Sequence, residues 1–259
     1  MLILLPPSEG KTAPRRGRPL DLAGLGFPAL TGAREQVLDA LVALCRDDPD
    51  KAVATLDVPK SQLDLIDLNC RLRTAPTARA DHVYAGVLYD ALDVRTLSAG
   101  AKRRAGTRLA VTSSLFGLVA PADRIPAYRL SGDAVLPGLG SVAGLWREHL
   151  GPAATEALGD GLLVDLRSGM YAAFWRPPAG LAKRVATVRV LHEVAGRRQV
   201  VSHFNKATKG RIVRALLEGG ANPRSPAKLA TVLRDLGWTV EVGEPTPKGT
   251  QLDVVVAAL

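Results

Sequence analysis

The chain opens with MLILLPPSEGK, Met1 to Lys11, in which five apolar residues run into two prolines and a polar loop. A short continuous apolar run bounded by prolines is typical of a strand buried on both faces, as in parallel sheets. Loops at strand ends carry binding groups in α/β proteins, so the hydroxyl of Ser8, the carboxylate of Glu9 and the ammonium of Lys11 are candidate ligand contacts. The segment therefore predicts a first strand followed by a functional loop.

Two more buried strands are expected farther along the chain, and each runs into polar residues. One strand covers residues 109–112 of RLAVTSSLFG, and the other is LLVDL at 162–166, which exits into RSGMY. Ser113 follows the first, and Ser168 and Tyr171 follow the second. Strand-end loops of an α/β sheet gather at one edge, so these side chains are candidates for the same site as Ser8.

A proline-containing stretch after residue 113 ends in Tyr128 and Arg129. Two interpretations of this pair stay open. Either both residues contact a ligand, or Tyr128 packs in the core while Arg129 pairs with Asp123 or Asp165. No GxSxG hydrolase signature occurs here, so the serines of this segment do not indicate a hydrolase nucleophile.

The segment VVSHFNKATKGR, residues 200–211, combines a β-rich half with a basic half. We expect residues 198–204 to pair with 185–193 in a hairpin through VAGR, and a helix to begin with Asn205 as its N-cap. Lys206, Lys209 and Arg211 would then stand in the first helical turn, where N–H groups and the helix dipole favour an anion. The alternative is a solvated basic face.

Apolar periodicity predicts further helices at residues 32–45, 59–72, 92–104, 141–158, 205–217 and 225–236, and closing strands at 238–242 and 252–259. Strands mixed with helices and one hairpin indicate an α/β fold with a mixed β-sheet and surrounding helices. The prediction is a single domain, 1–259, with a small inserted helical region at about 32–80.

Composition limits the partners. The formal net charge of +9 and the pI of about 9.9 favour phosphate-bearing partners such as nucleic acid or nucleotides. Two cysteines, Cys45 and Cys70, are too few for a disulfide framework and indicate the cytosol. The opening apolar run is too short for a signal peptide or membrane span, and four dispersed histidines predict no metal site. We expect no cofactor, no metal and no membrane partner.

These segments, in this order, resemble the peroxide stress protein YaaA family. The resemblance covers MLILLPP, HVYAG at 82–86, SSLFGLVAPADRIPAYRL at 113–130, the region of Trp146, DLRSGMY and VSHFNKATKGR. It implies one compact α/β protein with an inserted helix-hairpin-helix-like element and a positively charged cleft. It also implies a cytoplasmic protein of the hydrogen peroxide response that limits damage from intracellular iron, in a family with one member described as DNA-binding. The positions that the family retains are Pro7, Lys11, Tyr84, Gly86, Ser113, Gly117, Pro121, Asp123, Tyr128, Arg129, Trp146, Ser168, Tyr171, Ser202, Lys206 and Gly210.

The leading function prediction is a YaaA-family stress protein that binds DNA or phosphate-bearing ligands through a basic cleft. The predicted ligand contacts are Ser8, Lys11, Ser113, Tyr128, Arg129, Ser202, Lys206, Lys209 and Arg211. The alternative is an enzyme acting on a nucleotide or another phosphorylated small molecule, with Glu9 as general base and Ser168 and Tyr171 near the reacting centre. A third hypothesis, an interaction module without a ligand, requires Lys206 and Lys209 to lie far from Ser8 and Tyr171.

Overall fold

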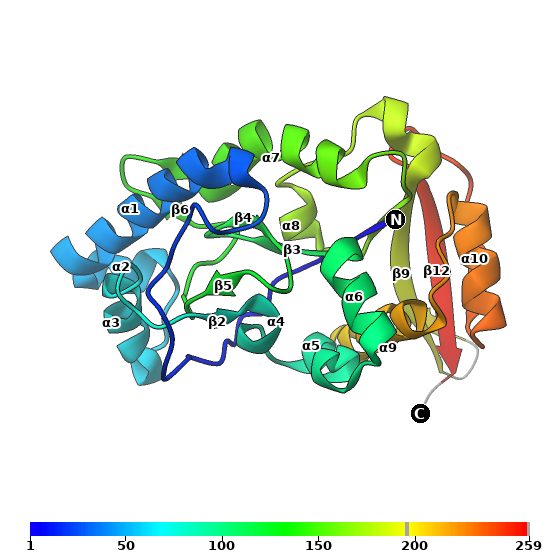
Figure 1. Cartoon of the computed structure of the whole chain (residues 1–259), viewed down its shortest axis with the longest axis horizontal. Coiled ribbons are helices and arrows are strands. Elements are labelled where there is room, and N and C mark those ends of the chain that lie inside the picture. The colour runs from blue at the N-terminus through cyan, green and yellow to red at the C-terminus, as the bar shows by residue number, and fades with distance from the viewer. Residues whose placement is uncertain (195–196, 258–259) are drawn as a thin grey trace.

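The computed structural model describes residues 1–194 and 197–257 and is built around one mainly parallel sheet (Figure 1). The sheet has eight strands in the order β11-β12-β9-β8-β1-β3-β4, with β10 paired to β9. Its strands are β1 (Leu2–Leu5), β3 (Leu109–Ser113), β4 (Gly117–Val119), β8 (Leu163–Asp165), β9 (Val185–Val194), β10 (Arg197–Gln199), β11 (Thr239–Val242) and β12 (Thr250–Ala257). The α/β class with a mixed sheet is therefore confirmed.

The first strand lies at the centre of this sheet, between β3 and β8 and parallel to both. Leu5 pairs with Val111 of β3, and Leu4 pairs with Asp165 of β8. All four residues of β1 are buried, because helices and loops cover both faces of the sheet. The three strands end together, so the loops that follow them meet at one edge.

Helices surround the sheet on both sides. They are α1 (Thr31–Asp47), α2 (Pro49–Thr55), α3 (Asp64–Cys70), α4 (Ala80–Val83), α5 (Val87–Leu92), α6 (Ala99–Arg108), α7 (Val142–Leu158), α8 (Gly169–Ala172), α9 (Ser202–Gly219) and α10 (Pro226–Asp235). Short 3₁₀ turns are η1 (Pro28–Leu30), η2 (Lys60–Gln62), η3 (Val94–Thr96) and η4 (Ala179–Arg184), and two small ribbons pair β2 (Ala78–Arg79) with β5 (Arg124–Ile125) and β6 (Val135–Leu136) with β7 (Gly140–Ser141).

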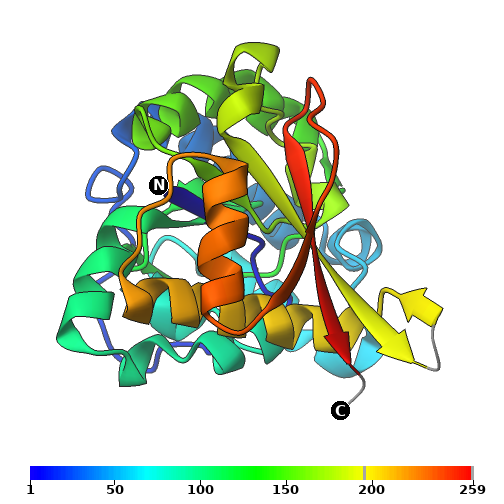
Figure 2. The same ribbon diagram turned by 90° about the vertical axis from the view of Figure 1, so that its right-hand side faces the viewer.

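In Figure 1, α1, α2 and α3 gather at the left end, α7 runs along the top, and α5 and α9 lie below. Figure 2 shows α10 beside the long strands β9 and β12 at the other end of the sheet, with α9 passing beneath. The region between residues 32 and 80 is mainly helical. Within it, α3 is shorter than the helix predicted for 59–72, because η2 and a turn occupy its first residues.

Helices α5 and α9 pack with their backbones in contact. A Cβ atom added to Gly210 of α9 would lie 2.2 Å from the carbonyl oxygen of Leu88 and 2.9 Å from the Cβ of Ala91. Contacts below 3 Å are repulsive, so only glycine permits this approach. Gly210 therefore fixes α9 against α5, and with it the direction of the lysines on α9.

The predicted strand at residues 198–204 is wrong beyond its first residues. β10 ends at Gln199, and α9 begins at Ser202 with Val201 as its N-cap. Asn205 is consequently inside the helix and is not its cap. Lys206 and Lys209 lie beyond the first turn, so the dipole argument for their position no longer applies. Residues 195–196 of the expected hairpin turn lie outside the described residues.

The basic helix expected at residues 92–104 is also displaced. η3 occupies residues 94–96, and α6 starts only at Ala99, where Ser98 caps it by accepting a hydrogen bond from the N–H of Ala101. The chain turns first because Asp93 has a positive φ of 41°, which ends α5. α6 then continues to Arg108, where β3 begins.

Candidate functional site

A cavity opens where the loops after β1 and β8 face α5 and α9. Its volume is about 800 Å³. We call it the lysine cavity, and its lining is Pro6, Pro7, Ser8, Glu9, Gly10, Lys11, Thr12, Ala85, Gly86, Val87, Leu88, Tyr89, Leu166, Ser168, Met170, Tyr171, Asn205, Lys206 and Lys209. These residues come from four separate segments of the chain, which the parallel strands and the α5–α9 packing bring together.

Lys11 is held firmly at one end of the lysine cavity. Its ammonium donates a hydrogen bond of 2.8 Å to the carbonyl oxygen of Ser8 and lies 4.1 Å from the centre of the Tyr128 ring. Burial removes water from this ammonium and lowers its pKa from 10.5 to about 8, while the neighbouring Glu9 opposes the shift. The Lys11 ammonium has therefore lost much of its hydration, and a bound anion would stabilise its charged form.

A buried hydroxyl cluster supports the Lys11 side chain from behind. The hydroxyls of Tyr128 and Ser113 share a hydrogen bond of 2.8 Å, and those of Tyr128 and Tyr84 share one of 3.1 Å. Burial raises the pKa of both tyrosines, so they stay protonated. Ser113 and Tyr128 thus position Lys11 and do not line the cavity themselves.

Lys209 occupies the opposite wall, on α9. Its ammonium donates a hydrogen bond of 3.0 Å to the carbonyl oxygen of Leu166, at the end of β8. Burial lowers its pKa, and the carboxylate of Asp165 opposes that shift. Lys206, one turn earlier, is exposed at the cavity mouth. Two partly buried ammoniums and one exposed ammonium therefore face one space.

Asn205 joins the lysines on the same face of α9, although the sequence indicated only a capping role for it. Its Oδ1 atom is buried and has no hydrogen-bond partner among residues 1–194 and 197–257. An unpaired buried acceptor costs about 1–3 kcal/mol. A ligand that carries a hydrogen-bond donor would satisfy it. The spacing of residues 205, 206 and 209 on one helical face was the available sequence signal.

The loop after β8 is fixed by a buried ion pair. Arg167 donates two hydrogen bonds to the carboxylate of Asp165, of 2.9 and 2.7 Å, and two more to the carbonyl oxygens of Tyr171 and Trp175. These four hydrogen bonds stabilise the charge of the buried guanidinium. It sets the path of the segment that presents Ser168 and Tyr171 to the cavity.

Glu9 and Arg129 form an ion pair at the rim, with 2.5 Å between Oε2 and Nη1. Both carboxylate partners proposed for Arg129 from the sequence, Asp123 and Asp165, are therefore wrong. Asp123 instead accepts hydrogen bonds from the backbone N–H groups of residues 26 and 120. Arg129 belongs to the wall outside the lysine cavity.

The placement of the candidate residues divides into two groups. Ser8, Glu9, Lys11, Ser168, Tyr171, Lys206 and Lys209 line the lysine cavity. The second group does not line it: Ser113 and Tyr128 lie behind Lys11, Arg129 lies beyond Glu9, and Arg211 is exposed elsewhere on α9. Ser202 begins α9, but its side chain lies outside the described residues.

The described part of the chain contains neither a cluster of metal-ligating side chains nor a helix that could span a membrane. No group of three or more His, Cys, Asp or Glu side chains is placed to hold a metal ion there. No helix in residues 1–194 or 197–257 has the length and apolar character needed to cross a membrane. The chemistry that the lysine cavity offers is binding and polarising an anion through ammonium, hydroxyl and amide groups.

Comparison with known proteins shows what this chain is similar to. A family model described as "Peroxide stress protein YaaA" matches residues 1–242. A UPF0246 protein of Streptomyces coelicolor is 52% identical over 258 residues, 99% of this chain and 98% of that protein. A UPF0246 protein of Corynebacterium efficiens is 42% identical over 246 residues, 94% of this chain and 96% of that protein, and an uncharacterised Campylobacter jejuni protein is 27% identical over 210 residues, 81% and 82% of the two chains.

Proposed function

This chain belongs to the peroxide stress protein YaaA family, and from that premise we propose that it binds a phosphate-bearing small molecule, with a nucleotide as the best fit, in the lysine cavity. The observation that carries the proposal is the meeting of Lys11, Lys206 and Lys209 in one cavity. Glu9 is the single carboxylate among its described lining residues, and Arg129 pairs with it. The cavity therefore has an excess of positive charge that an anion would neutralise.

The burial of two lysines favours phosphate over a neutral ligand. Lys11 and Lys209 have lost hydration, which lowers the pKa of each ammonium. A bound phosphate replaces the missing water with charge-assisted hydrogen bonds, which are stronger than neutral ones. Binding energy is thus available from ammonium groups that burial leaves poorly solvated.

The rest of the lining suits a planar organic group. Leu88, Tyr89, Met170 and Tyr171 supply apolar and aromatic surface, and Asn205 offers an amide oxygen that has no partner among the described residues. The volume of about 800 Å³ lies within the range of about 300–1,000 Å³ that is usual for small-molecule sites. A nucleotide combines the two parts, with its phosphates at the lysines and its base against the apolar wall.

The family's description adds a physiological expectation, that this binding serves the response to hydrogen peroxide. We propose that the stress role depends on the lysine cavity. In a bacterium lacking its own family member, expression of this chain should improve survival of a peroxide challenge, and a Lys206→Ala chain should not. Equal survival with both chains would contradict the link between cavity and stress role.

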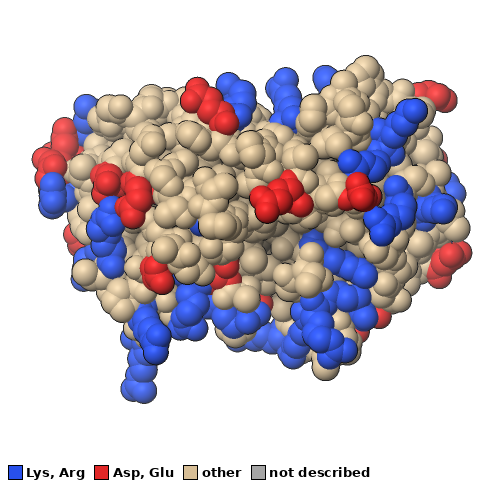
Figure 3. All heavy atoms as spheres, turned by 45° about the horizontal axis from the view of Figure 1, so that its top comes forward, with Lys and Arg blue, Asp and Glu red and all other residues tan. Residues whose placement is uncertain are grey.

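A second candidate function is DNA binding, and the charge of the molecule favours it. The net charge is +9, and Figure 3 shows many Lys and Arg side chains along the lower edge and the right side of the face that it draws. Non-specific DNA binding should weaken steeply with salt and depend little on sequence. A titration of random duplex at low ionic strength tests this, and absence of binding there would remove it.

The binding experiment uses the full chain and a panel of AMP, ADP, ATP, GTP and inorganic phosphate, with melting temperature as the readout. A ligand present at 100 times its Kd stabilises the folded state by about 2.7 kcal/mol. We expect Lys206→Ala to abolish most of the shift and Arg211→Ala, on the same helix but outside the cavity, to retain it.

Three results of this screen separate the candidates. Indifference of the wild-type chain to the whole panel would refute the small-molecule proposal. Equal loss in Lys206→Ala and Arg211→Ala would indicate a diffuse basic surface and favour DNA. Release of phosphate or another product from a bound nucleotide would support the enzyme alternative, and Ser168→Ala and Tyr171→Phe would then test the catalytic roles.

A further inference from the structure

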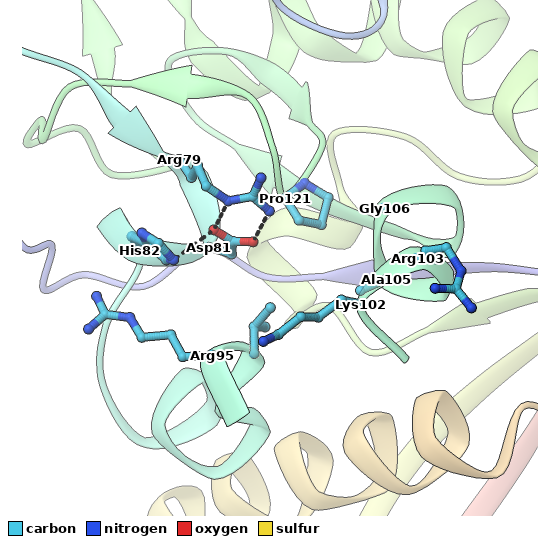
Figure 4. Close-up of a pocket in the computed structure, with 10 residues that line it drawn as sticks. Arg79, Asp81, His82, Arg95, Lys102, Arg103, Ala105, Gly106 and Pro121 are labelled. Atoms are coloured by element: carbon cyan, nitrogen blue, oxygen red, sulfur yellow. Dashed lines mark hydrogen bonds and ion pairs between the residues drawn. The ribbon is translucent and has the colours of Figure 1, made fainter. Parts of the chain in front are cut away.

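A second cavity lies on another part of the surface, between α4, η3 and α6 (Figure 4). Its volume is also about 800 Å³, and none of its lining residues belongs to the lysine cavity. We call it the arginine groove, and its charged and ionisable lining residues are Arg79, Asp81, His82, Arg95, Lys102 and Arg103. The proposed function above makes no use of these side chains.

One wall of the arginine groove is a fixed ion pair. Arg79 donates hydrogen bonds of 3.0 and 2.7 Å to the two carboxylate oxygens of Asp81, and the Asp81 side chain is only 4% exposed. The planar guanidinium is therefore held in one orientation by a bidentate contact. Two of its five N–H donors are used in this contact, and the other three make no hydrogen bond with the described residues. His82 stands next to the pair, with 3.7 Å between its Nε2 and the Asp81 carboxylate.

The opposite wall carries cations without a partner. The side chains of Arg95 and Lys102 make no hydrogen bond or ion pair with the described residues, whereas Arg104 and Arg108, on α6 with Lys102, donate to carbonyl oxygens of residues 217–221. Figure 4 shows Arg95 reaching toward His82 and Lys102 extending toward the hollow beneath Asp81, while Arg103 points away. The unpartnered cations thus converge on the fixed pair.

The charge balance indicates what fits. Arg79, Arg95 and Lys102 contribute three positive charges, and Asp81 contributes one negative charge, so the converging groups keep two positive charges when His82 is neutral. We propose that the arginine groove is a second anion site, which takes a compact phosphate compound with at least two negative charges, such as pyrophosphate or a phosphate monoester. Convergence from three separate elements on one hollow favours a compact anion over a nucleic acid strand, which needs cations spaced along a track.

The test is a calorimetric titration of the full chain with pyrophosphate at low salt, since both cavities accept this probe. The wild-type chain should show two binding events. Lys206→Ala should remove the event of the lysine cavity and leave the groove event, which isolates it. In that background, Lys102→Ala and Arg95→Ala should each weaken pyrophosphate binding about tenfold, the effect of losing one charge-assisted contact. Lys228→Ala, an equal loss of charge on α10 and outside both cavities, should change it less than about twofold.

Each result bears on one site. Undiminished binding in both Lys102→Ala and Arg95→Ala, or no groove event in the Lys206→Ala chain, would overturn the second site while leaving the lysine cavity intact. An equal loss in Lys228→Ala would indicate general electrostatic attraction and would overturn it as well. If Lys102→Ala and Arg95→Ala weaken the binding of a DNA duplex but not of pyrophosphate, the proposal of a compact anion is wrong and the groove binds a nucleic acid strand. All three side chains are exposed, so thermal melts should show unchanged folding.

Discussion

Replacing Lys11 by methionine should change how the stability of the protein depends on pH. The pKa of Lys11 falls from 10.5 to about 8 on folding, chiefly because burial disfavours its charged form. At 1.36 kcal/mol for each pKa unit, folding with a charged Lys11 costs about 3 kcal/mol more than folding with the neutral amine. Methionine has a similar volume and no charge, so Lys11→Met does not incur this cost.

The direction of the effect follows from proton binding. Below about pH 8 the folded and unfolded states both carry the proton, and the full cost applies. Between pH 8 and 10.5 the unfolded chain binds more protons than the folded chain, so stability rises with pH. The free energy of unfolding of wild type minus that of Lys11→Met should therefore increase by up to about 3 kcal/mol across this window.

Urea unfolding of both chains at half-unit steps from pH 7 to 10.5 measures this difference, in which the other titrating groups cancel. Lys206→Met removes an exposed ammonium from the same cavity, and its difference from wild type should change far less. A wild-type minus Lys11→Met difference that stays flat, or falls, would refute the claim that Lys11 is desolvated. A saturating phosphate ligand should shrink the effect, because an anion beside Lys11 restores the charged form.

Two packing predictions accompany this one. Gly210→Ala should destabilise the protein by about 1–3 kcal/mol, because its Cβ would lie 2.2 Å from the carbonyl oxygen of Leu88. Gly219→Ala on the same helix meets nothing nearer than 3.6 Å and should be neutral or stabilising by about 0.5–1 kcal/mol. Equal melting temperatures of the two variants in thermal melts would disprove the contact. Asn69→Ala should lower the free energy of unfolding by about 2–4 kcal/mol, because its amide exchanges hydrogen bonds of 2.8 and 2.9 Å with the backbone of Arg129, and a loss below 0.5 kcal/mol in urea unfolding would show that these bonds contribute little.

Local patterns predicted the sheet well where burial is uniform. The continuous apolar runs at residues 2–5, 109–113 and 163–165 are strands as expected, because a strand buried on both faces needs apolar side chains at every position. The polar residues that follow each run indicated an edge with binding groups. Ser8 and Lys11 after the first run and Ser168 after the third line the lysine cavity, whereas Ser113 after the second lies behind Lys11.

The strand prediction for residues 198–204 was wrong for a definite physical reason. Val200 and Val201 favour a strand by propensity, yet α9 starts immediately after them. Its start depends on packing along its whole length, including the close contact of Gly210 with α5, and no local pattern near Ser202 contains that information. Asn205 was therefore interpreted as a cap, whereas it is the fourth residue of α9 and lines the cavity.

Sequence alone determined the apolar strands, the polar segments behind them and the helical spacing of Lys206 and Lys209, because hydrophobic burial is non-directional and shows in short-range periodicity. Only the tertiary structure decided which charges meet: that Arg129 pairs with Glu9, 120 residues away, and that Lys11 shares a cavity with Lys209. These contacts between charged side chains depend on the order of strands in the sheet and on the approach of α9 to α5. Water leaves Lys11 and Lys209 only after those long-range contacts form, so the property that suits both lysines to an anion exists only in the folded chain.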